Sequence, residues 1–359
     1  MSSARTAHLD QLTGARGLAA WFVVLYHIRL SLVSILPEQV IGVFAYGYLA
    51  VDIFFLLSGF VMWISYGERF RDTGGAIIAP FLWKRFARIW PLHALVLAGF
   101  MMLVLVLAVS GRSIDAYPLA ELPLHIVLMQ NWGFTDALSW NPPAWSISTE
   151  FAAYLAFPAI VLAIKWERLS KTMLVAVLFG LTLALHGWFA QFGATSLGDE
   201  IPKTGLVRCL IEFTMGIALA QLWRHMRSDR HGAILALGVS VALATTGLAA
   251  GLAQTLWVPL CCSALLLALA LDTGPAARWL GSYRLVQLGD WSYATYLSHY
   301  LLFIAFKLAF VGEDLQTGWA GLIGYMAMVL VCSALLYSRF EKPVQSWLNR
   351  HPPLLFRAA

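Results

Sequence analysis

The chain has 359 residues, of which 60% are hydrophobic and only 12% are charged, and its mean hydropathy is +0.73. Soluble domains carry about a quarter charged residues, so this composition excludes an ordinary soluble fold and indicates an integral membrane protein. The net charge of +5 does not indicate nucleic-acid binding, because the basic residues lie in short loops between apolar runs. We therefore expect membrane lipid as a partner, and no nucleic acid.

Apolar runs of about 20 residues, the length that crosses a bilayer, recur along the whole chain. They predict one all-α membrane domain over residues 1–359. Its transmembrane helices, about ten in number, are expected at 14–34, 41–66, 86–109, 145–164, 172–190, 205–223, 232–251, 254–271, 288–310 and 318–340. The segment 119–132 is too short to span and is interrupted by Pro123, which predicts a re-entrant or interfacial piece.

The loops between these spans differ sharply in charge. Eighteen of the 24 lysines and arginines fall in one set of alternate loops, whereas the opposite set holds only Arg112 and Lys203. Cytoplasmic loops are enriched in Lys and Arg, so both termini are predicted to be cytoplasmic. The polar N-terminus lacks the pattern of a signal peptide, so the first span is expected to stay in the mature protein.

The first span carries two ionisable residues, Arg16 and His27, eleven positions apart. At about 100° per residue they share one helix face, and at about 1.5 Å per residue they are roughly 16 Å apart along the axis. This face places a fixed cation at the cytoplasmic end and an imidazole at depth, which suits a long substrate with an anionic head. The alternatives are an arginine that reaches lipid headgroups and a histidine bonded to a backbone carbonyl.

The next two spans add a carboxylate and a basic cluster. Asp52 lies within the second span, where a carboxylate needs a cation, a donor or a proton. Lys84, Arg85 and Arg88 lie at the start of the third span, where Lys84 and Arg88 share a face. The functional interpretation is a phosphate clamp. The alternatives are a structural ion pair for Asp52 and an ordinary cytoplasmic flank for the basic cluster.

Further ionisable residues lie in later spans. Glu150 follows the helix-initiating segment NPPAWSIS, and His299 lies in the ninth span. Arg208 and Glu212 are four residues apart and are expected to pair with each other. The four cysteines show no zinc-binding spacing, so no metal is expected.

Six elements, taken in order, resemble the acyltransferase-3 family of membrane acyltransferases. The first comprises Asp10, Leu12, Arg16, Gly17, Ala19, Ala20, Val23 and His27. The others are AVDIFFLLSGF, KRFARIWP, WSISTE, SYATYLSH and the final Glu341-Lys342-Pro343. Lys84 stands where an arginine is usual, Phe151 where a second acidic residue often follows, and Ser298 where tryptophan is usual.

This resemblance implies an acyl-CoA-dependent O-acyltransferase in the bacterial inner (plasma) membrane. It implies functional roles for Arg16 and His27 and for the basic element that contains Lys84 and Arg88. We expect the stand-alone form, without the hydrolase-like domain that many relatives carry at the C-terminus.

The mechanism that we expect has His27 as general base, with Glu150 or Asp52 orienting its ring. Arg16, Lys84 and Arg88, with Arg85 beside them, would hold acyl-CoA phosphates in one cytoplasmic cavity that ends at His27. In a second version His27 carries the acyl group covalently.

Two further questions stay open at this point: what accepts the acyl group, expected to be acetyl, and whether any chemistry occurs. The acceptor is expected to be a hydroxyl of a carbohydrate-containing molecule, such as cell-surface polysaccharide or lipopolysaccharide. A small glycosylated molecule such as an antibiotic is the alternative. A different class, a transporter without chemistry, would also explain buried ionisable residues. The sequence does not set the oligomeric state.

Overall fold

The computed structural model describes residues 9–229, 231–311 and 316–356, and within these ranges the chain forms helices and no strands. Seven segments of the described chain are long and apolar enough to cross a membrane: Glu38–Val109, Pro142–Ala163, Lys171–Ala190, Ile201–Met226, Gly232–Ala249, Gln254–Leu271 and Trp319–Arg350. The protein is thus an all-α, multi-pass membrane protein, which confirms the predicted fold class.

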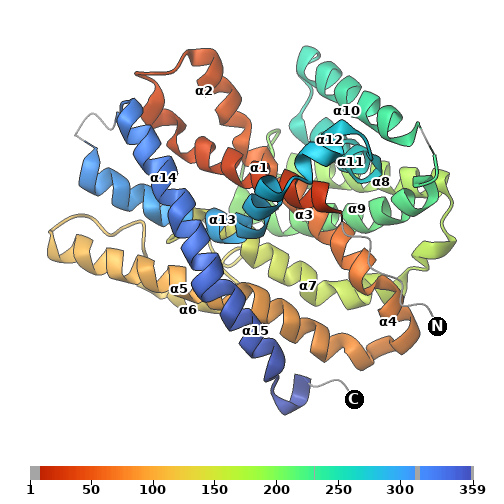
Figure 1. Cartoon of the computed structure of the whole chain (residues 1–359), viewed down its shortest axis with the longest axis horizontal. Helices are drawn as coiled ribbons and strands as arrows, with labels where there is room; N and C mark the ends of the chain where they lie inside the picture. Colours follow the sequence, from red (N-terminus) through yellow and green to blue (C-terminus); the bar gives the residue numbers. More distant parts are fainter. Residues whose placement is uncertain (1–8, 230, 312–315, 357–359) are drawn as a thin grey trace.

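A helix overlaps each of the ten predicted ranges (Figure 1). These are α1 (Asp10–Ile28), α3 (Ala50–Met62), α5 (Ile78–Val109), α7 (Trp145–Ala163), α8 (Lys171–Ala190), α9 (Ile201–Met226), α10 (Gly232–Ala249), α11 (Gln254–Leu271), α13 (Tyr283–Phe310) and α14 (Trp319–Leu335). The shorter helices are α2 (Glu38–Ala45), α4 (Glu68–Thr73), α6 (Leu122–Ile126), α12 (Pro275–Leu280) and α15 (Lys342–Arg350). The number of membrane crossings and the side of the termini stay predictions.

The helix α5 begins at Ile78, well before the predicted start at residue 86. Lysine and arginine are good helix formers, so the basic cluster continues the helix instead of preceding it. The C-terminal rod of α14 and α15 crosses this part of α5 (Figure 1). There the indole of Trp83 donates a hydrogen bond to the carbonyl of Leu348, at 3.0 Å. Arg85 and Arg88 therefore project from a regular, packed helix.

Two helices that pack closely, α1 and α13, carry the histidines. A Cβ atom on Gly17 would lie 2.7 Å from the backbone nitrogen of Gly289, and one on Gly289 would lie 1.9 Å from the carbonyl oxygen of Thr13. Small residues let membrane helices approach this closely. Residue 17 meets residue 289 and residue 27 meets residue 299, so the two helices run parallel.

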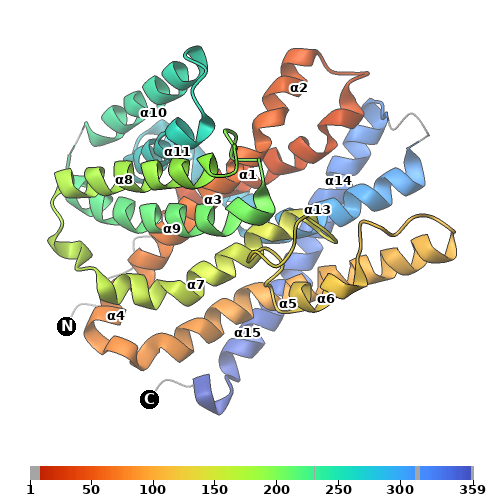
Figure 2. The ribbon, with the colours of Figure 1, turned by 180° about the vertical axis from the view of Figure 1, so that it is seen from behind.

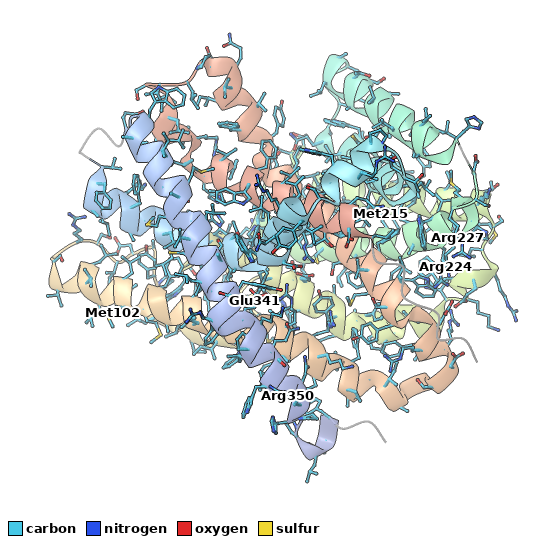
Figure 3. The ribbon with its side chains drawn as sticks, in the orientation of Figure 1. Met102, Met215, Arg224, Arg227, Glu341 and Arg350 are labelled. Carbon is cyan, nitrogen blue, oxygen red and sulfur yellow. The ribbon has the colours of Figure 1, made fainter. Side chains whose placement is uncertain are left out.

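Burial differs greatly among the helices, which separates the core from the lipid-facing surface. In the apolar 18-residue stretch of α9, 72% is buried, compared with 22% in that of α10. Large apolar side chains are exposed on α10, such as Ile234, and on α5, such as Met102 (Figure 3). In a membrane protein such side chains face lipid. Arg208 and Glu212 of α9 are buried inside the bundle.

The connection between α5 and α7 folds back onto the molecule instead of extending from it. It contains two 3₁₀ turns (Leu119–Glu121 and Pro142–Ala144), the short helix α6 and a long irregular stretch. Figure 2 shows this connection, in yellow, lying across the middle of the molecule. Gln130, Asn131 and Asn141 in this stretch are buried. Pro123 lies in the short helix α6, so the segment 119–132 contains no continuous helix long enough to cross the membrane. Its re-entrant or interfacial position stays a prediction.

Candidate active site

A cavity of about 190 Å³ lies between α1, α3, α5, α7 and α13. Its polar and ionisable lining consists of Arg16, Ser58, Arg85, Arg88, Ser146, Glu150, Tyr154, Ser292, Tyr293 and Tyr296. Three guanidinium groups therefore face one carboxylate. Positive charge in excess, within a concave and partly apolar surface, suits an anionic ligand.

Arg16 reaches the cavity wall from α1 but is only partly satisfied by the protein. One terminal nitrogen, Nη2, donates to the carbonyl of Gly289 at 2.8 Å. Its Nε is buried and has no hydrogen-bond partner among the described residues. A buried N–H without a partner is costly and calls for an explanation, such as a ligand.

The two arginines of α5 differ in their partners. Arg85 packs among the aromatic rings of Tyr66, Phe81 and Tyr154, and its buried Nε lacks a partner within the described chain. Arg88 forms an ion pair with Glu341.

Glu341, the family's late acidic residue, lies on the C-terminal rod (Figure 3). Its carboxylate therefore reaches the cavity's edge through Arg88. Lys84 is exposed and does not line the cavity.

Glu150 projects from α7 into the same cavity, but it does not contact His27. Its Oε1 accepts hydrogen bonds from the hydroxyls of Ser58, at 2.7 Å, and Tyr154, at 2.5 Å. The expectation that Glu150 or Asp52 orients His27 therefore has no counterpart in this geometry, because both carboxylates have other partners.

His27 instead lies against a second histidine. Its Nδ1 is 3.1 Å from Nε2 of His299 and 3.0 Å from the carbonyl oxygen of Val23. The ring of His299 is completely buried, and its Nδ1 lies 2.6 Å from the carbonyl oxygen of Tyr296. Sequence reasoning named both histidines but not their contact.

These contacts assign the protons of the pair. A carbonyl oxygen only accepts, so Nδ1 of His299 carries a hydrogen and its Nε2 is an acceptor. Nδ1 of His27 must then carry the hydrogen that is shared between His299 and Val23. This leaves the lone pair of His27 on Nε2, for which the described residues provide no partner. The arrangement is that of a base whose ring is oriented by a second group.

Tyr296 connects the histidines to the cavity. It lines the cavity, and its ring centre lies 6.0 Å from that of His299. Its hydroxyl is hydrogen-bonded to Ser146 at 2.7 Å. Neither histidine lines the cavity, so the expectation that the cavity ends at His27 has no counterpart in this geometry; of these four residues, Tyr296 and Ser146 line it. These two residues were not singled out from the sequence, although both lie inside matched motifs, SYATYLSH and WSISTE.

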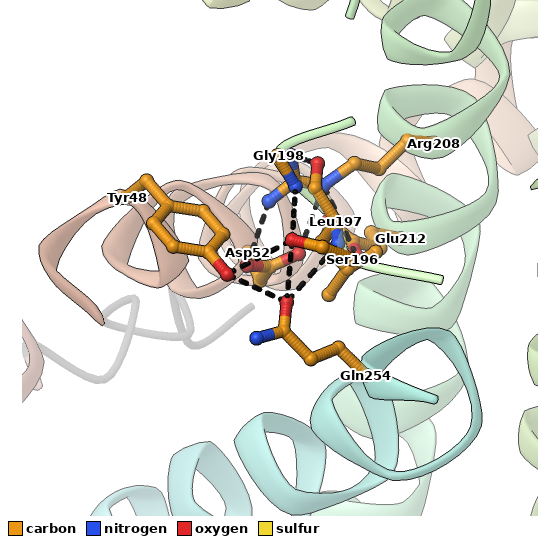
Figure 4. Close-up of polar contacts among 8 residues, drawn as sticks. All are labelled: Tyr48, Asp52, Ser196, Leu197, Gly198, Arg208, Glu212 and Gln254. Atoms are coloured by element: carbon orange, nitrogen blue, oxygen red, sulfur yellow. Dashed lines mark hydrogen bonds and ion pairs between the residues drawn. The ribbon is translucent and has the colours of Figure 1, made fainter. Parts of the chain in front are cut away.

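The remaining ionisable residues form a separate buried cluster (Figure 4). Arg208 lies 2.7 and 3.0 Å from the two carboxylate oxygens of Asp52, whereas Glu212 is 3.8 Å away. The main partner of Arg208 is thus Asp52, not the Glu212 expected from helix spacing. Arg208 also donates to the carbonyl of Leu197 at 2.8 Å, which ties the loop before α9 to α3.

None of these three residues lines the arginine cavity. Within the described ranges, the structure brings together no group of three His, Cys, Asp or Glu side chains that could hold a metal ion.

Comparison with known proteins places this geometry among acyltransferases. The family model described as an acyltransferase domain, that of the acyltransferase-3 family, matches residues 9–338. The chain is 29% identical to acyltransferase MdmB of Streptomyces mycarofaciens, over 98% of this chain and 95% of that protein. It is 24% identical to the peptidoglycan O-acetyltransferase OatA of Listeria monocytogenes, over 60% of this chain and 34% of that protein. No solved structure matches the chain.

Proposed function

The chain belongs to the acyltransferase-3 family and is a multi-pass membrane acyltransferase, and from this premise we propose its reaction. It moves an acyl group, most simply acetyl, from acyl-CoA to a hydroxyl of a carbohydrate-containing acceptor. The membrane is the bacterial inner membrane.

The observation that carries the chemistry is the hydrogen bond between His27 and His299. His27 Nε2 accepts the proton of the acceptor hydroxyl while the hydroxyl oxygen attacks the thioester carbonyl. The carbon–sulfur bond then breaks, and the departing thiolate takes the proton from the imidazolium, giving an ester and free CoA. His299 is a positioning residue, because it holds the ring of His27 through Nδ1.

The arginine cavity supports the donor side of the proposal. CoA carries several phosphate charges, and Arg16, Arg85 and Arg88 offer guanidinium groups around one space. The unpartnered Nε atoms of Arg16 and Arg85 would be satisfied by phosphate oxygens. The pantetheine arm would pass Tyr296 to bring the thioester toward His27. Lys84, being exposed, would act only at the outer rim.

The acceptor side rests on the relatives. One of them is named as a peptidoglycan O-acetyltransferase, which supports a carbohydrate polymer as acceptor. A small glycosylated molecule such as an antibiotic stays the alternative acceptor. A transporter without chemistry does not account for membership in an acyltransferase family.

The decisive experiment compares cell glycans with and without the protein by mass spectrometry. We expect acetyl esters on a glycan hydroxyl that disappear with the gene and with His27→Ala. Incubation of purified protein with radiolabelled acetyl-CoA, without acceptor, then separates the two versions of the chemistry. A labelled protein band that is lost on treatment with acid or hydroxylamine and is absent from His27→Ala would contradict the general-base version in favour of a covalent histidine intermediate. Absence of any acyl transfer or CoA release by the parent protein would overturn the proposed function.

A further inference from the structure

A second, small pocket lies on the other side of the turn that starts α7. It is bounded by the connection between α5 and α7 and has a volume of about 10 Å³, which is room for one water-sized group. Asn141, Pro142 and Trp145 line it, whereas Ser146 and Ile147, next in the chain, line the arginine cavity. One turn of chain thus separates the two spaces.

Three buried side chains line this pocket, and each retains a polar atom without a partner among the described residues. His125, Gln130 and Asn141 are 2%, 5% and 4% exposed. The unpartnered atoms are Nδ1 of His125, Oε1 of Gln130 and Oδ1 of Asn141. Such atoms are rare in folded proteins because an unmade buried hydrogen bond is costly.

All three atoms are hydrogen-bond acceptors, which the surrounding contacts establish. The amide nitrogen of Gln130 donates to the carbonyl of Ala144 at 3.2 Å, and that of Asn141 donates to the carbonyl of Leu297 at 3.0 Å. The amide oxygen of each side chain is therefore the atom without a hydrogen-bond partner.

The tautomer of His125 follows from the same reasoning. Ser139 gives its hydrogen to Glu121 at 2.5 Å, so its oxygen accepts from Nε2 of His125, at 3.0 Å. The lone pair of His125 is then on Nδ1. The three atoms without a partner are thus acceptors, and a complementary ligand would donate to them.

The backbone around the pocket is strained. Leu128 and Trp140, both buried, have φ of 60° and 56° in the left-handed region, which side chains with a Cβ rarely adopt. Strain of this kind persists where the surrounding structure fixes it, and it clusters at binding sites. The exposed Ala137 forms part of the rim, so the pocket lies close to the surface.

We propose that this pocket binds hydroxyl groups of the carbohydrate acceptor, an inference that rests on the proposed function. Its volume admits one hydroxyl group, which can donate a hydrogen bond. Asn141 donates a hydrogen bond to the backbone carbonyl of Leu297 on α13, the helix that also carries His299. In the predicted orientation the pocket opens on the side opposite the basic loops. Donor and acceptor would thus enter from opposite sides of the membrane.

Binding of two saccharides, chitotetraose and maltotetraose, to the purified full chain by titration calorimetry tests this inference without requiring turnover. We expect at least one to bind, and Gln130→Met to weaken that binding by about tenfold, the effect of one buried hydrogen bond. The matched control is Gln221→Met, because Gln221 is also a buried glutamine but lies on α9, outside the pocket. His125→Phe is the second test variant, in case Gln130→Met fails to fold.

The possible outcomes test the proposed pocket and the proposed reaction separately. If neither saccharide binds, or if Gln130→Met and His125→Phe bind as tightly as the control, the pocket holds only a structural water and the inference is overturned. If binding depends on Gln130 but no acyl group is transferred from acetyl-CoA, the pocket stands and the proposed function fails. Both stand if Gln130→Met raises the saccharide KM about tenfold while leaving the acetyl-CoA KM unchanged.

Discussion

Two groups of ionisable side chains lie inside the helix bundle, and they differ in whether they line an open space. In the Asp52–Arg208 cluster, both carboxylate oxygens face the guanidinium group and a backbone carbonyl completes its contacts. In the arginine cavity, Arg16 and Arg85 each keep a buried Nε without a partner in the described part of the chain. Both groups bury charge and keep polar atoms without a hydrogen-bond partner among the described residues, including both carboxylate oxygens of Glu212, but of the two only the second lines a cavity.

This difference separates a structural ion pair from a binding site. A buried pair that is broken leaves an uncompensated charge, so its loss is felt in stability. A cation that lines a cavity is available to a ligand, so its loss is felt in binding. The following predictions test this division, beginning with the chemistry next to the cavity.

His27→Ala should have the largest effect on activity. A general base contributes about 10²–10⁴-fold, so kcat for acyl transfer should fall by at least about a hundredfold. Steady-state assays with acetyl-CoA and acceptor would measure the loss. Thermal unfolding and acetyl-CoA binding, measured on the same preparation, should resemble those of the parent. Near-normal turnover would remove His27 from the mechanism.

Arg208→Gln should act on stability instead. Removal of one partner from a buried ion pair costs about 3–5 kcal/mol, since Asp52 is left buried without its cation. A lower unfolding temperature in detergent is the expected result, with an unchanged KM for acetyl-CoA in the fraction that folds. A stable variant with weakened acetyl-CoA binding would contradict this distinction and assign the Asp52–Arg208 cluster to the binding site.

His299→Leu should lower kcat by about ten- to a hundredfold, because Nδ1 of His27 loses one of its two partners. His299→Gln places an amide oxygen near the position of Nε2 and should restore much of the activity. The pH dependence of kcat/KM gives a second measurement, since a positioning residue should alter the apparent pKa of the base. Equal losses in both variants would indicate a packing role only.

Arg16→Ala should raise the KM for acetyl-CoA by about tenfold, the scale of a charge-assisted hydrogen bond. Lys84→Ala is the matched comparison. Lys84 is exposed and outside the cavity, so its effect should be less than about threefold and should vanish in high salt. Equal effects of the two substitutions would contradict the assignment of the cavity as the phosphate site.

Local sequence was sufficient for most of the helical framework. Apolar runs alone predicted where helices lie, because the bilayer requires about 20 apolar residues for each crossing. Six motifs in order identified the family, which the match over residues 9–338 confirms. The sequence also named several ionisable residues that line the cavity, such as Arg16 and Glu150, since ionisable residues in apolar runs are conspicuous.

Local sequence patterns could not predict which ionisable side chains contact each other, because these contacts depend on which helices become neighbours. His27 and His299 are 272 positions apart, and they meet only because Gly17 and Gly289 let α1 and α13 approach closely. Asp52 and Arg208 are 156 positions apart, and their contact is shorter than that of the pair expected within one helix, Arg208 and Glu212. Helical periodicity predicts which residues share a face, whereas the packing of α1, α3, α9 and α13 determines which faces meet.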